Sequence, residues 1–249
     1  MGRTYEALKR AEEERLLRQE GLTAVATKTT LQPYKPFRLS ISDHVSEEYL
    51  RVKHNLCLLL PEYGSKVLLF VGSARGEGTS TVVATFAMIL ASSGERVLLI
   101  DANFRQPSQH DIFGVERANG VTESLFGSIP AKNFFKKTRI NNLSILTSGL
   151  PPSNPALVLG SKKICSMIEQ VKNEADWIVL DAPPVNEYCD AMAFCSEIDG
   201  VLFVVQAEKT KWEAAQKAKQ RINDAGGKVV GVVLNRRKLY IPEWVYKWL

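Results

Sequence analysis

The sequence predicts an α/β fold, a doubly wound and mostly parallel sheet covered by helices on both faces. Two observations lead to this prediction. Six runs of strand length are apolar at nearly every position, and helical segments alternate with them along the chain. Strands that are apolar on both sides are typical of parallel sheets between two helical layers. A glycine-rich loop also follows the first run, at a place where such sheets bind ligands.

The composition is that of a globular chain with a substantial core. The 249 residues are 45% hydrophobic and 24% charged, which fits one α/β domain and an appendage. No apolar run approaches the roughly 18 residues that span a bilayer, so we expect a cytoplasmic protein. The four cysteines form no CxxC pair and are expected to be free core thiols. The net charge of +5 comes without a long basic tract, so no nucleic-acid partner is predicted.

The first 45 residues are expected to lie outside the main domain. Residues 1–20 are rich in Ala, Leu, Glu, Arg and Lys and predict an N-terminal helix. Residues 21–45 contain Pro33 and Pro36 and show little periodicity, so they predict an extended linker. The main domain is therefore predicted over residues 46–249.

Strands and helices alternate regularly in this domain. The predicted strands are 66–73, 96–102, 143–149, 177–183, 200–207 and 228–235. The predicted helices lie near 46–61, 79–94, 155–174, 190–196 and 210–225. Ligands of parallel sheets bind at the carboxyl ends of the strands, so the residues that close each strand are the functional candidates.

The first strand ends in the loop GSARGEGTSTV, residues 72–82. Gly76 and Gly78 allow the backbone to curl so that successive N–H groups point inward. A helix that begins near Thr79 adds the positive end of its dipole. Ser80 stands where phosphate-binding loops carry the hydroxyl that ligates Mg²⁺. Taken alone, the loop is also compatible with a tight structural turn.

Two further strands end in an aspartate. Asp101 closes the run LLID, and Asp181 closes the run WIVLD. A carboxylate at the end of a buried strand is costly unless it meets a cation or hydrogen-bond donors. With the Ser80 hydroxyl, the two carboxylates supply the hard oxygen ligands that Mg²⁺ prefers. Each aspartate by itself is also compatible with a helix cap, but their convergence favours a magnesium–phosphate site.

Several longer motifs occur in order along the chain. They are GEGTST, LLIDANFRQPSQHDIFG, GLPPSNPALVLGS, DWIVLDAPPV, DGVLFVV and GVVLNR. With these motifs the chain, from about residue 46 onward, resembles the cytoplasmic kinase domain of the bacterial tyrosine kinases that control capsule and exopolysaccharide synthesis. That family is a branch of the deviant P-loop NTPases of the MinD and ParA type. The double proline Pro183–Pro184 favours it over the partitioning ATPases.

The resemblance implies binding of ATP with Mg²⁺. It places Asp101 and Asn103 at the catalytic position and Asn235 and Arg236 beside the adenine, although Asn235 is also compatible with a strand-end turn. The residues implied to bind the nucleotide are Arg75, Gly76, Glu77, Gly78, Thr79, Ser80, Thr81, Asn235 and Arg236. The residues implied to hold the metal are Ser80, Asp101 and Asp181.

The chain departs from the family at positions that perform the chemistry. Thr79 replaces the lysine of the Walker A loop, so transfer is expected to slow on the order of 10²–10³-fold while the backbone part of the site survives. Arg75, where relatives usually carry proline, is the candidate substitute cation. Asn103 replaces the second aspartate of the acidic motif, and an amide cannot act as a base.

Features of assembly and substrate depart as well. The Glu-x-x-Arg-x-x-Arg helix that builds the family's oligomer has Leu50 in place of its first arginine. The tyrosine-rich tail is reduced to Tyr240 and Tyr246. The resemblance implies a membrane polysaccharide co-polymerase or adaptor as partner, a homo-oligomer, and peripheral association with the inner face of the plasma membrane through that adaptor.

We therefore expect a Mg-ATP-binding, tyrosine-kinase-like regulator of capsule or exopolysaccharide biosynthesis and export, with weak or lost phosphoryl transfer. A non-catalytic interaction scaffold for the co-polymerase is the alternative from another functional class. A partitioning-type ATPase is a third hypothesis, and it predicts salt-sensitive DNA binding.

Overall fold

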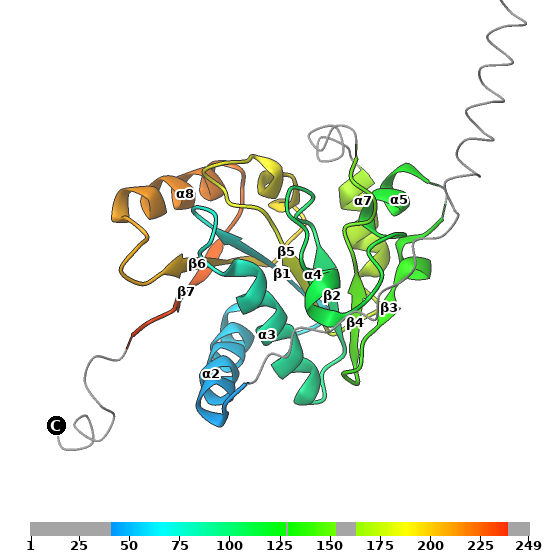
Figure 1. Ribbon diagram of the computed structural model, residues 1–249, viewed down its shortest axis with the longest axis horizontal. Coiled ribbons are helices and arrows are strands. Elements are labelled where there is room, and N and C mark those ends of the chain that lie inside the picture. The colour runs from blue at the N-terminus through cyan, green and yellow to red at the C-terminus, as the bar shows by residue number, and fades with distance from the viewer. Residues whose placement is uncertain (1–40, 128, 153–162, 239–249) are drawn as a thin grey trace, which may run out of the picture. The chain divides into compact units, whose positions relative to one another are not determined.

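The computed structural model describes residues 41–127, 129–152 and 163–238. In this part of the chain one sheet has the strand order β3-β4-β2-β5-β1-β6-β7 (Figure 1). All pairings are parallel except that of β3 with β4. The strands are β1 (Lys66–Gly72), β2 (Val97–Asp101), β3 (Lys136–Lys137), β4 (Leu143–Leu146), β5 (Trp177–Asp181), β6 (Gly200–Gln206) and β7 (Val229–Asn235).

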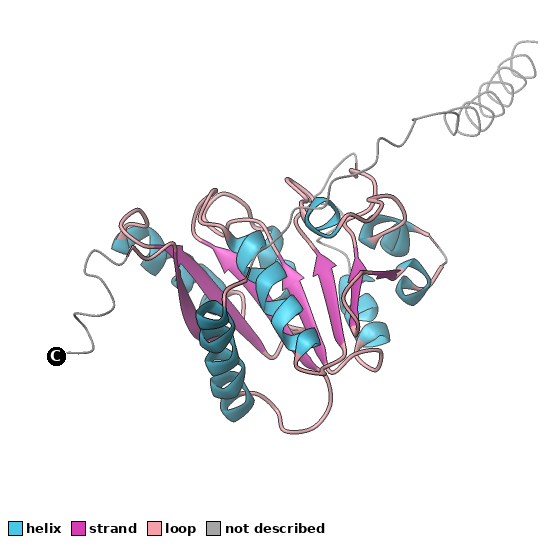
Figure 2. Ribbon diagram, turned by 60° about the horizontal axis from the view of Figure 1, so that its bottom comes forward, coloured by secondary structure: helices cyan, strands magenta, loops and turns pink. Residues whose placement is uncertain are grey.

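Helices cover both faces of the sheet. The α-helices are α2 (Asp43–Leu59), α3 (Thr79–Ser92), α4 (Gln109–Phe113), α5 (Val121–Phe126), α7 (Lys163–Val171) and α8 (Trp212–Asp224). The 3-10 helices are η1 (Ala131–Phe134) and η2 (Asp190–Phe194). One core contains residues of α2, α3 and α4, and the other contains residues of α5, α7, α8 and both 3-10 helices. Figure 2 shows α2 and α3 side by side on one face of the strands.

The central strands explain why the sheet is buried on both sides. Along β1, Val67 and Leu69 pack into one core while Leu68 and Phe70 pack into the other, because successive side chains of a strand point to opposite faces. All four side chains are buried. The prediction of an α/β fold with a doubly wound, mostly parallel sheet is therefore confirmed.

Most of the predicted elements are present. All six predicted strands form, but β3, α4, α5 and η1 have no counterpart in the sequence prediction, because each is too short to show a clear period. Residues 190–194 form a 3-10 helix instead of the expected α-helix. The predicted helix over 1–20, most of the linker, and the start of the predicted helix over 155–174 lie outside the described residues.

The helix predicted near residues 46–61 begins three residues earlier than expected. Helix α2 begins at Asp43, because Ser42 has extended backbone and its hydroxyl accepts a hydrogen bond from the Val45 N–H at 3.5 Å. Serine at this position satisfies an N–H group that has no partner inside the helix. The last five residues of the predicted linker therefore include the first turn of α2.

The expectation that the four cysteines are core thiols is confirmed for one of them. All four are free, but Cys57 and Cys189 are exposed, Cys165 is partly buried, and only Cys195 lies in a core. Apolar neighbours in the sequence do not decide which face of an element a residue occupies.

Among the described residues, no helix combines the length and the hydropathy needed to cross a membrane.

The strand order places the functional candidates together. Strand β1 lies between β5 and β6. After β1 the chain adds β2 to β5 on one side of this strand, and it then adds β6 and β7 on the other side. Such a switch point opens a crevice at the carboxyl ends of the strands, which is where open α/β sheets bind ligands. The glycine-rich loop leaves β1 at this point, and β2, β5, β6 and β7 end around it.

Candidate functional site

The loop between β1 and α3 has the backbone of a phosphate-binding loop. Gly76 and Gly78 have φ angles of +83° and +85°, values that side-chain-bearing residues adopt only with strain. Gly78 is the N-cap of α3, so Thr79, Ser80 and Thr81 form its first turn. The N–H groups of a first helical turn have no partner within the helix, and the helix dipole favours an anion there. The loop can therefore bind a phosphate group through its backbone.

The side chain of Glu77 supports the loop from inside the protein. Its carboxylate is 4% exposed and accepts hydrogen bonds from the Ser73 N–H at 2.6 Å and the Ala74 N–H at 3.1 Å. The Thr210 hydroxyl, which follows β6, donates to the same carboxylate at 2.6 Å. A Cβ on Gly72 would stand 2.5 Å from a carboxylate oxygen of Glu77, so only glycine fits there. The side chain of Glu77 is thus used to hold the loop in shape, so only its backbone is left to contact a nucleotide.

Asp101 and Asp181 lie side by side at the ends of β2 and β5. They are register partners in the parallel pairing, and both are completely buried. Asp101 accepts hydrogen bonds from three backbone N–H groups, those of Asn103 at 3.2 Å, Ser108 at 3.1 Å and Gln109 at 3.1 Å. Asp181 accepts one from the Gln109 side chain at 2.7 Å through Oδ2, and its buried Oδ1 has no partner. This carboxylate oxygen is thus left for a ligand.

The electrostatics of this pair favour a cation. Burial, and after it the charge of Asp181, raises the pKa of Asp101, against the hydrogen bonds that it accepts. Burial also raises the pKa of Asp181, against the opposing influence of the neighbouring Gln109 and Ser80 side chains. No ion pair within the described residues includes either carboxylate. Two buried carboxylates with a nearby hydroxyl and an unpartnered oxygen fit a hard divalent cation such as Mg²⁺.

Gln109 is a site residue that the sequence prediction missed. This completely buried side chain opens α4 and donates from Nε2 to Asp181 at 2.7 Å and to the Ser80 carbonyl at 3.1 Å. Its Oε1 has no hydrogen-bond partner. Gln109 therefore connects the second acidic motif, the phosphate-binding loop and the end of β5. The one sequence signal for it is an uncharged amide eight residues after Asp101, which is too common to single out.

The residues after β2 have structural hydrogen bonds. Asn103 accepts a hydrogen bond from the Gln106 N–H at 3.1 Å through Oδ1 and so closes the turn that follows Asp101. Arg105 donates to both oxygens of Asp190 at 2.9 and 3.2 Å, and the Asp190 side chain is completely buried. The two-point geometry is the strong form of this pair. Arg105 thereby ties the loop after β2 to η2.

Arg75 is held by the loop that follows Asp181. Its N–H donates to Glu187 at 2.8 Å, and its Nε pairs with the same carboxylate at 2.9 Å. Its guanidinium also donates to the Tyr188 hydroxyl. The guanidinium carbons of Arg75 and Arg105 lie 5.4 and 4.8 Å from the centre of the Tyr188 ring. The cation expected as a substitute for the loop lysine is thus engaged with an acidic and an aromatic partner.

The end of β7 lies directly beside the phosphate-binding loop. Asn235 donates from Nδ2 to the Glu77 carbonyl at 2.8 Å, and a Cβ on Gly78 would stand 2.3 Å from this amide nitrogen. The side-chain Oδ1 of Asn235 also accepts from the Arg236 N–H at 2.9 Å. Arg236 has a φ of +56°, and its guanidinium Nη1 donates to the side-chain Oε1 of Gln206 at 3.4 Å. Asn235 is therefore more than a strand-end turn residue, because it fixes the shape of the loop.

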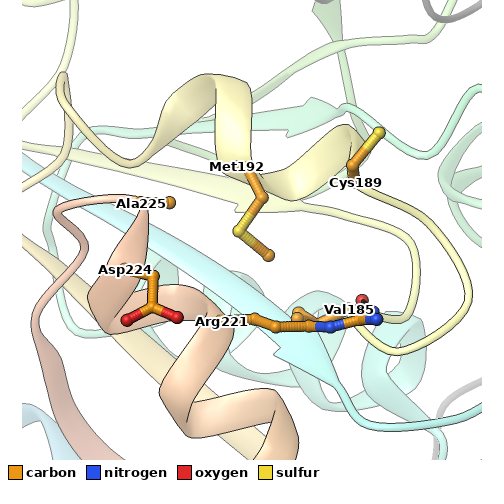
Figure 3. Close-up of a pocket in the computed structure, with 6 residues that line it drawn as sticks. All are labelled: Val185, Cys189, Met192, Arg221, Asp224 and Ala225. Carbon is orange, nitrogen blue, oxygen red and sulfur yellow. Dashed lines mark hydrogen bonds between the residues drawn. The ribbon is translucent and has the colours of Figure 1, made fainter.

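A hollow of about 390 Å³ lies behind the loop that follows β5 (Figure 3). Its lining includes Val185, Cys189, Met192 and Asp224. Arg221 of α8 borders the hollow and donates to the carbonyl of Val185 at 2.9 Å. The hollow contains none of the predicted site residues. The hydrogen bond from Arg221 fixes the loop that begins at Asp181.

Helix α2 carries the motif expected to build an oligomer. Leu50 is 41% exposed, Glu48 and Arg51 form an ion pair at 2.9 Å, and Lys53 pairs with Glu95 of the turn after α3 at 2.6 Å. Lys53, the second basic position of the motif, is thus engaged within the chain. The exposed leucine replaces a charged group on the surface of the helix.

The chain is similar in sequence and in fold to several known proteins. Residues 64–245 match the family model described as "ParA: NUBPL iron-transfer P-loop NTPase". A putative tyrosine-protein kinase, CapB of Staphylococcus aureus, is 32% identical over 77% of this chain and 84% of its own length. The tyrosine-protein kinase YwqD of Bacillus subtilis is 31% identical over 78% and 82%. The crystal structure of the chimerical protein CapA2B2 superposes with a TM-score of 0.75 at 28% identity and covers 81% of this chain and 88% of that one.

Proposed function

The chain belongs to the ParA-like P-loop NTPases and, among them, to the bacterial tyrosine kinases, and from this premise we propose that it is a Mg-ATP-binding regulator of polysaccharide biosynthesis and export whose phosphoryl transfer is weak or lost. The activity named for its relatives is the reason to consider transfer. The residues of this chain are the reason to expect that it binds the nucleotide but transfers the phosphoryl group weakly or not at all.

One observation carries the proposal. Asp101 and Asp181 are register partners, both completely buried, at the edge of the sheet where Ser80 opens α3. Burying two adjacent carboxylates opposes folding unless a cation joins them. The unpartnered Oδ1 of Asp181 supports a metal bound here, and the loop N–H groups support a phosphate beside it. Ser80, Asp101 and Asp181 would hold Mg²⁺, which when bound would neutralise part of the phosphate charge.

Two substitutions support weak transfer. Thr79 has no charge to offer the terminal phosphate, and the loss of one such donor lowers rates on the order of 10²–10³-fold. Asn103 is engaged in a turn through its carbonyl oxygen and cannot accept a proton from an incoming hydroxyl. Arg75 is paired with Glu187 and, in this arrangement, is not free to take the place of the loop lysine at the phosphates. Nucleotide binding therefore sets the assembled state of the protein, and chemistry contributes little.

Calorimetric titration of the full chain with Mg-ATP tests this function. We expect saturable binding that weakens strongly when Mg²⁺ is withdrawn, because the two aspartates then repel the nucleotide. Heat that stays at the dilution level up to millimolar Mg-ATP would contradict the proposal. Titration with DNA at low salt separates the partitioning-type hypothesis, which needs binding that disappears as salt is added.

The substitution Thr79→Lys tests the proposed cause of weak transfer. We expect ATP turnover to rise on the order of 10²–10³-fold, because a charge returns to the transition state. Thr79→Met is the matched control, since it adds length without charge. If Thr79→Lys binds Mg-ATP normally and turns over no faster, Asn103 or the sparse tail tyrosines become the better explanation.

A second candidate function, an interaction scaffold, is favoured by one surface feature. An apolar groove of about 400 Å³ lies between α2 and the edge strand β7. Leu58 of α2 is 74% exposed and Val232 of β7 is 62% exposed beside it. Apolar grooves of this kind are typical of docking surfaces. In a scaffold of this type nucleotide is not needed, so the same Mg-ATP titration distinguishes the two functions.

The proposed partner is a membrane-bound polysaccharide co-polymerase or adaptor supplied by another chain. Association with the inner face of the plasma membrane, from the cytoplasm, would then depend on that chain. Co-fractionation of the protein with membranes, with and without the neighbouring membrane-protein gene, tests this part. Membrane association that persists without any such gene would contradict it.

A further inference from the structure

The loop between β6 and α8 is fixed against the phosphate-binding loop. Thr210 donates its hydroxyl hydrogen to the Glu77 carboxylate at 2.6 Å, and its oxygen accepts from the Gln206 N–H at 2.9 Å. The Ala207 N–H donates to the Asn235 carbonyl at 2.9 Å. The main chain on both sides of Lys209 is therefore tied to residues that shape the phosphate site.

Lys209 brings a positive charge to the mouth of that site. Its side chain is exposed, and its Nζ stands 3.9 Å from the place where a Cβ on Gly76 would lie. Gly76 adopts a φ of +83°, so glycine is favoured there by the backbone, and the ammonium group is in ordinary contact distance of this position. Among the ion pairs of the described residues, none includes Lys209.

The other cations near the loop are differently placed. Arg75 is paired with Glu187 at 2.9 Å and bonded to Tyr188. The Nε of Arg236 lies 3.8 Å from the Cβ position of Gly78, but there the Asn235 amide is closer, at 2.3 Å. Within the described part of the chain, Lys209 thus brings its charged end to Gly76 with no other side-chain atom within 4 Å of the Cβ position there.

A phosphate-binding loop of this type normally carries its own lysine, which reaches the terminal phosphates of the nucleotide. Thr79 removes that charge. An ammonium is a compact charge on a flexible stem, so its position matters more than the segment that supplies it. We propose that Lys209 is a phosphate-binding residue, which supplies a charge for nucleotide binding from the β6–α8 loop but does not restore the contact of the missing lysine with the transition state. The inference rests on the proposed nucleotide binding and names a residue of that site.

The substitution Lys209→Gln tests the inference through binding, not turnover. Calorimetric titration of the full chain with Mg-ATP is expected to show affinity lowered about tenfold, the size of one charge-assisted hydrogen bond to a phosphate. Lys211→Gln is the matched control, because it removes the same charge two residues further along the same loop and is expected to leave affinity unchanged. Equal affinities for wild type and Lys209→Gln would overturn the inference, and so would equal losses in both variants.

A nucleotide series and a second substitution locate the charge. The loss in Lys209→Gln is expected for ATP and ADP and not for adenosine, since only the first two carry the phosphates at the loop. In the Thr79→Lys background the same substitution is expected to cost less than about threefold, because two cations that serve one phosphate do not act additively. An undiminished loss in that background would overturn the assignment of both cations to one phosphate. A wild type that binds no nucleotide would instead remove the proposed function and this inference together.

Discussion

The two flanks of the phosphate-binding loop are built in different ways. On the flank toward β2 and β5, Asp101, Asp181 and Gln109 are completely buried, and Asp101 is held by backbone N–H groups. On the flank toward β6 and β7, Lys209 and Arg236 are exposed and reach the loop with long side chains. The acidic flank, Asp101 and Asp181, is fixed at the ends of two neighbouring strands. The basic flank, Lys209 and Arg236, consists of exposed side chains that follow β6 and β7.

This difference indicates which groups of the site could be supplied from another position in the chain. A buried carboxylate pair opposes folding and is useful only where a metal joins it, so its position is tied to two neighbouring strands. An exposed lysine costs little wherever it stands. A charge lost at Thr79 can therefore be regained for nucleotide binding from another loop, whereas the loss of Asp101 or Asp181 cannot be repaired from elsewhere.

The largest expected effect belongs to the acidic flank. Asp181→Asn is expected to weaken Mg-ATP binding by about 100-fold or more and to abolish its dependence on Mg²⁺, because it removes an anionic ligand with a free oxygen. Calorimetry with and without Mg²⁺ measures both effects. The control is Asp176→Asn, at the opposite end of β5, where the carboxylate pairs with Arg96 on the surface. Undiminished Mg-dependent binding in Asp181→Asn would show that the acidic flank is not the metal site.

An intermediate effect on stability is expected to distinguish Arg75 from Arg105, which both lie against the ring of Tyr188. Arg105→Met leaves the completely buried Asp190 without its partner and is expected to lower the free energy of unfolding by about 2–3 kcal/mol. Arg75→Met breaks an exposed pair and is expected to cost less than about 1 kcal/mol. Urea denaturation of both variants measures the difference. Equal losses would mean that Arg75 is as structural as Arg105, and that the cluster around Tyr188 acts as a unit.

The smallest effect is a pH dependence of stability. Burial raises the pKa of Asp101 and Asp181, so the folded chain binds a proton more tightly than the unfolded chain. The stability that this contributes is complete below the ordinary aspartate pKa near 4 and is lost as the pH rises through the folded values. Between pH 5 and pH 8 the metal-free protein is expected to lose about 1–2 kcal/mol relative to Asp181→Asn, measured by denaturation at each pH.

The same titration predicts proton release on binding. A metal ligand must be deprotonated, so Mg-ATP binding at pH 7 is expected to release up to about one proton. Calorimetry in buffers of different ionisation enthalpy counts it. Stability that does not fall between pH 5 and pH 8, or binding without proton release, would show that the two carboxylates are already fully ionised in the metal-free protein.

The sequence predicted the fold well, because the longer elements carry strong patterns. The core strands are apolar at nearly every position, and the loop after β1 has glycines where the backbone needs them. Short elements such as α4 and β3 were missed, since five residues or fewer show no reliable period. The start of helix α2 was predicted three residues late because the capping role of Ser42 depends on one hydrogen bond.

The candidate site was predicted in part. Asp101 and Asp181 were identified because a charge at the end of an apolar run is a visible anomaly. Gln109 and Lys209 were not identified, because each is an ordinary polar residue whose meaning lies in what it approaches. Arg75 was expected near the phosphates, and the acid that holds it, Glu187, stands 112 residues away in the chain.

The sequence by itself determined the sheet, the loop, the two strand-end aspartates and the absence of a lysine at Thr79. These features are local, since each depends on residue types at a fixed spacing along one segment. Only the tertiary structure decided which side chains meet at the loop, because the β6–α8 loop and the phosphate-binding loop are brought together by the order of the strands. Hydrogen bonds and charges act through distance in space, and the fold sets that distance.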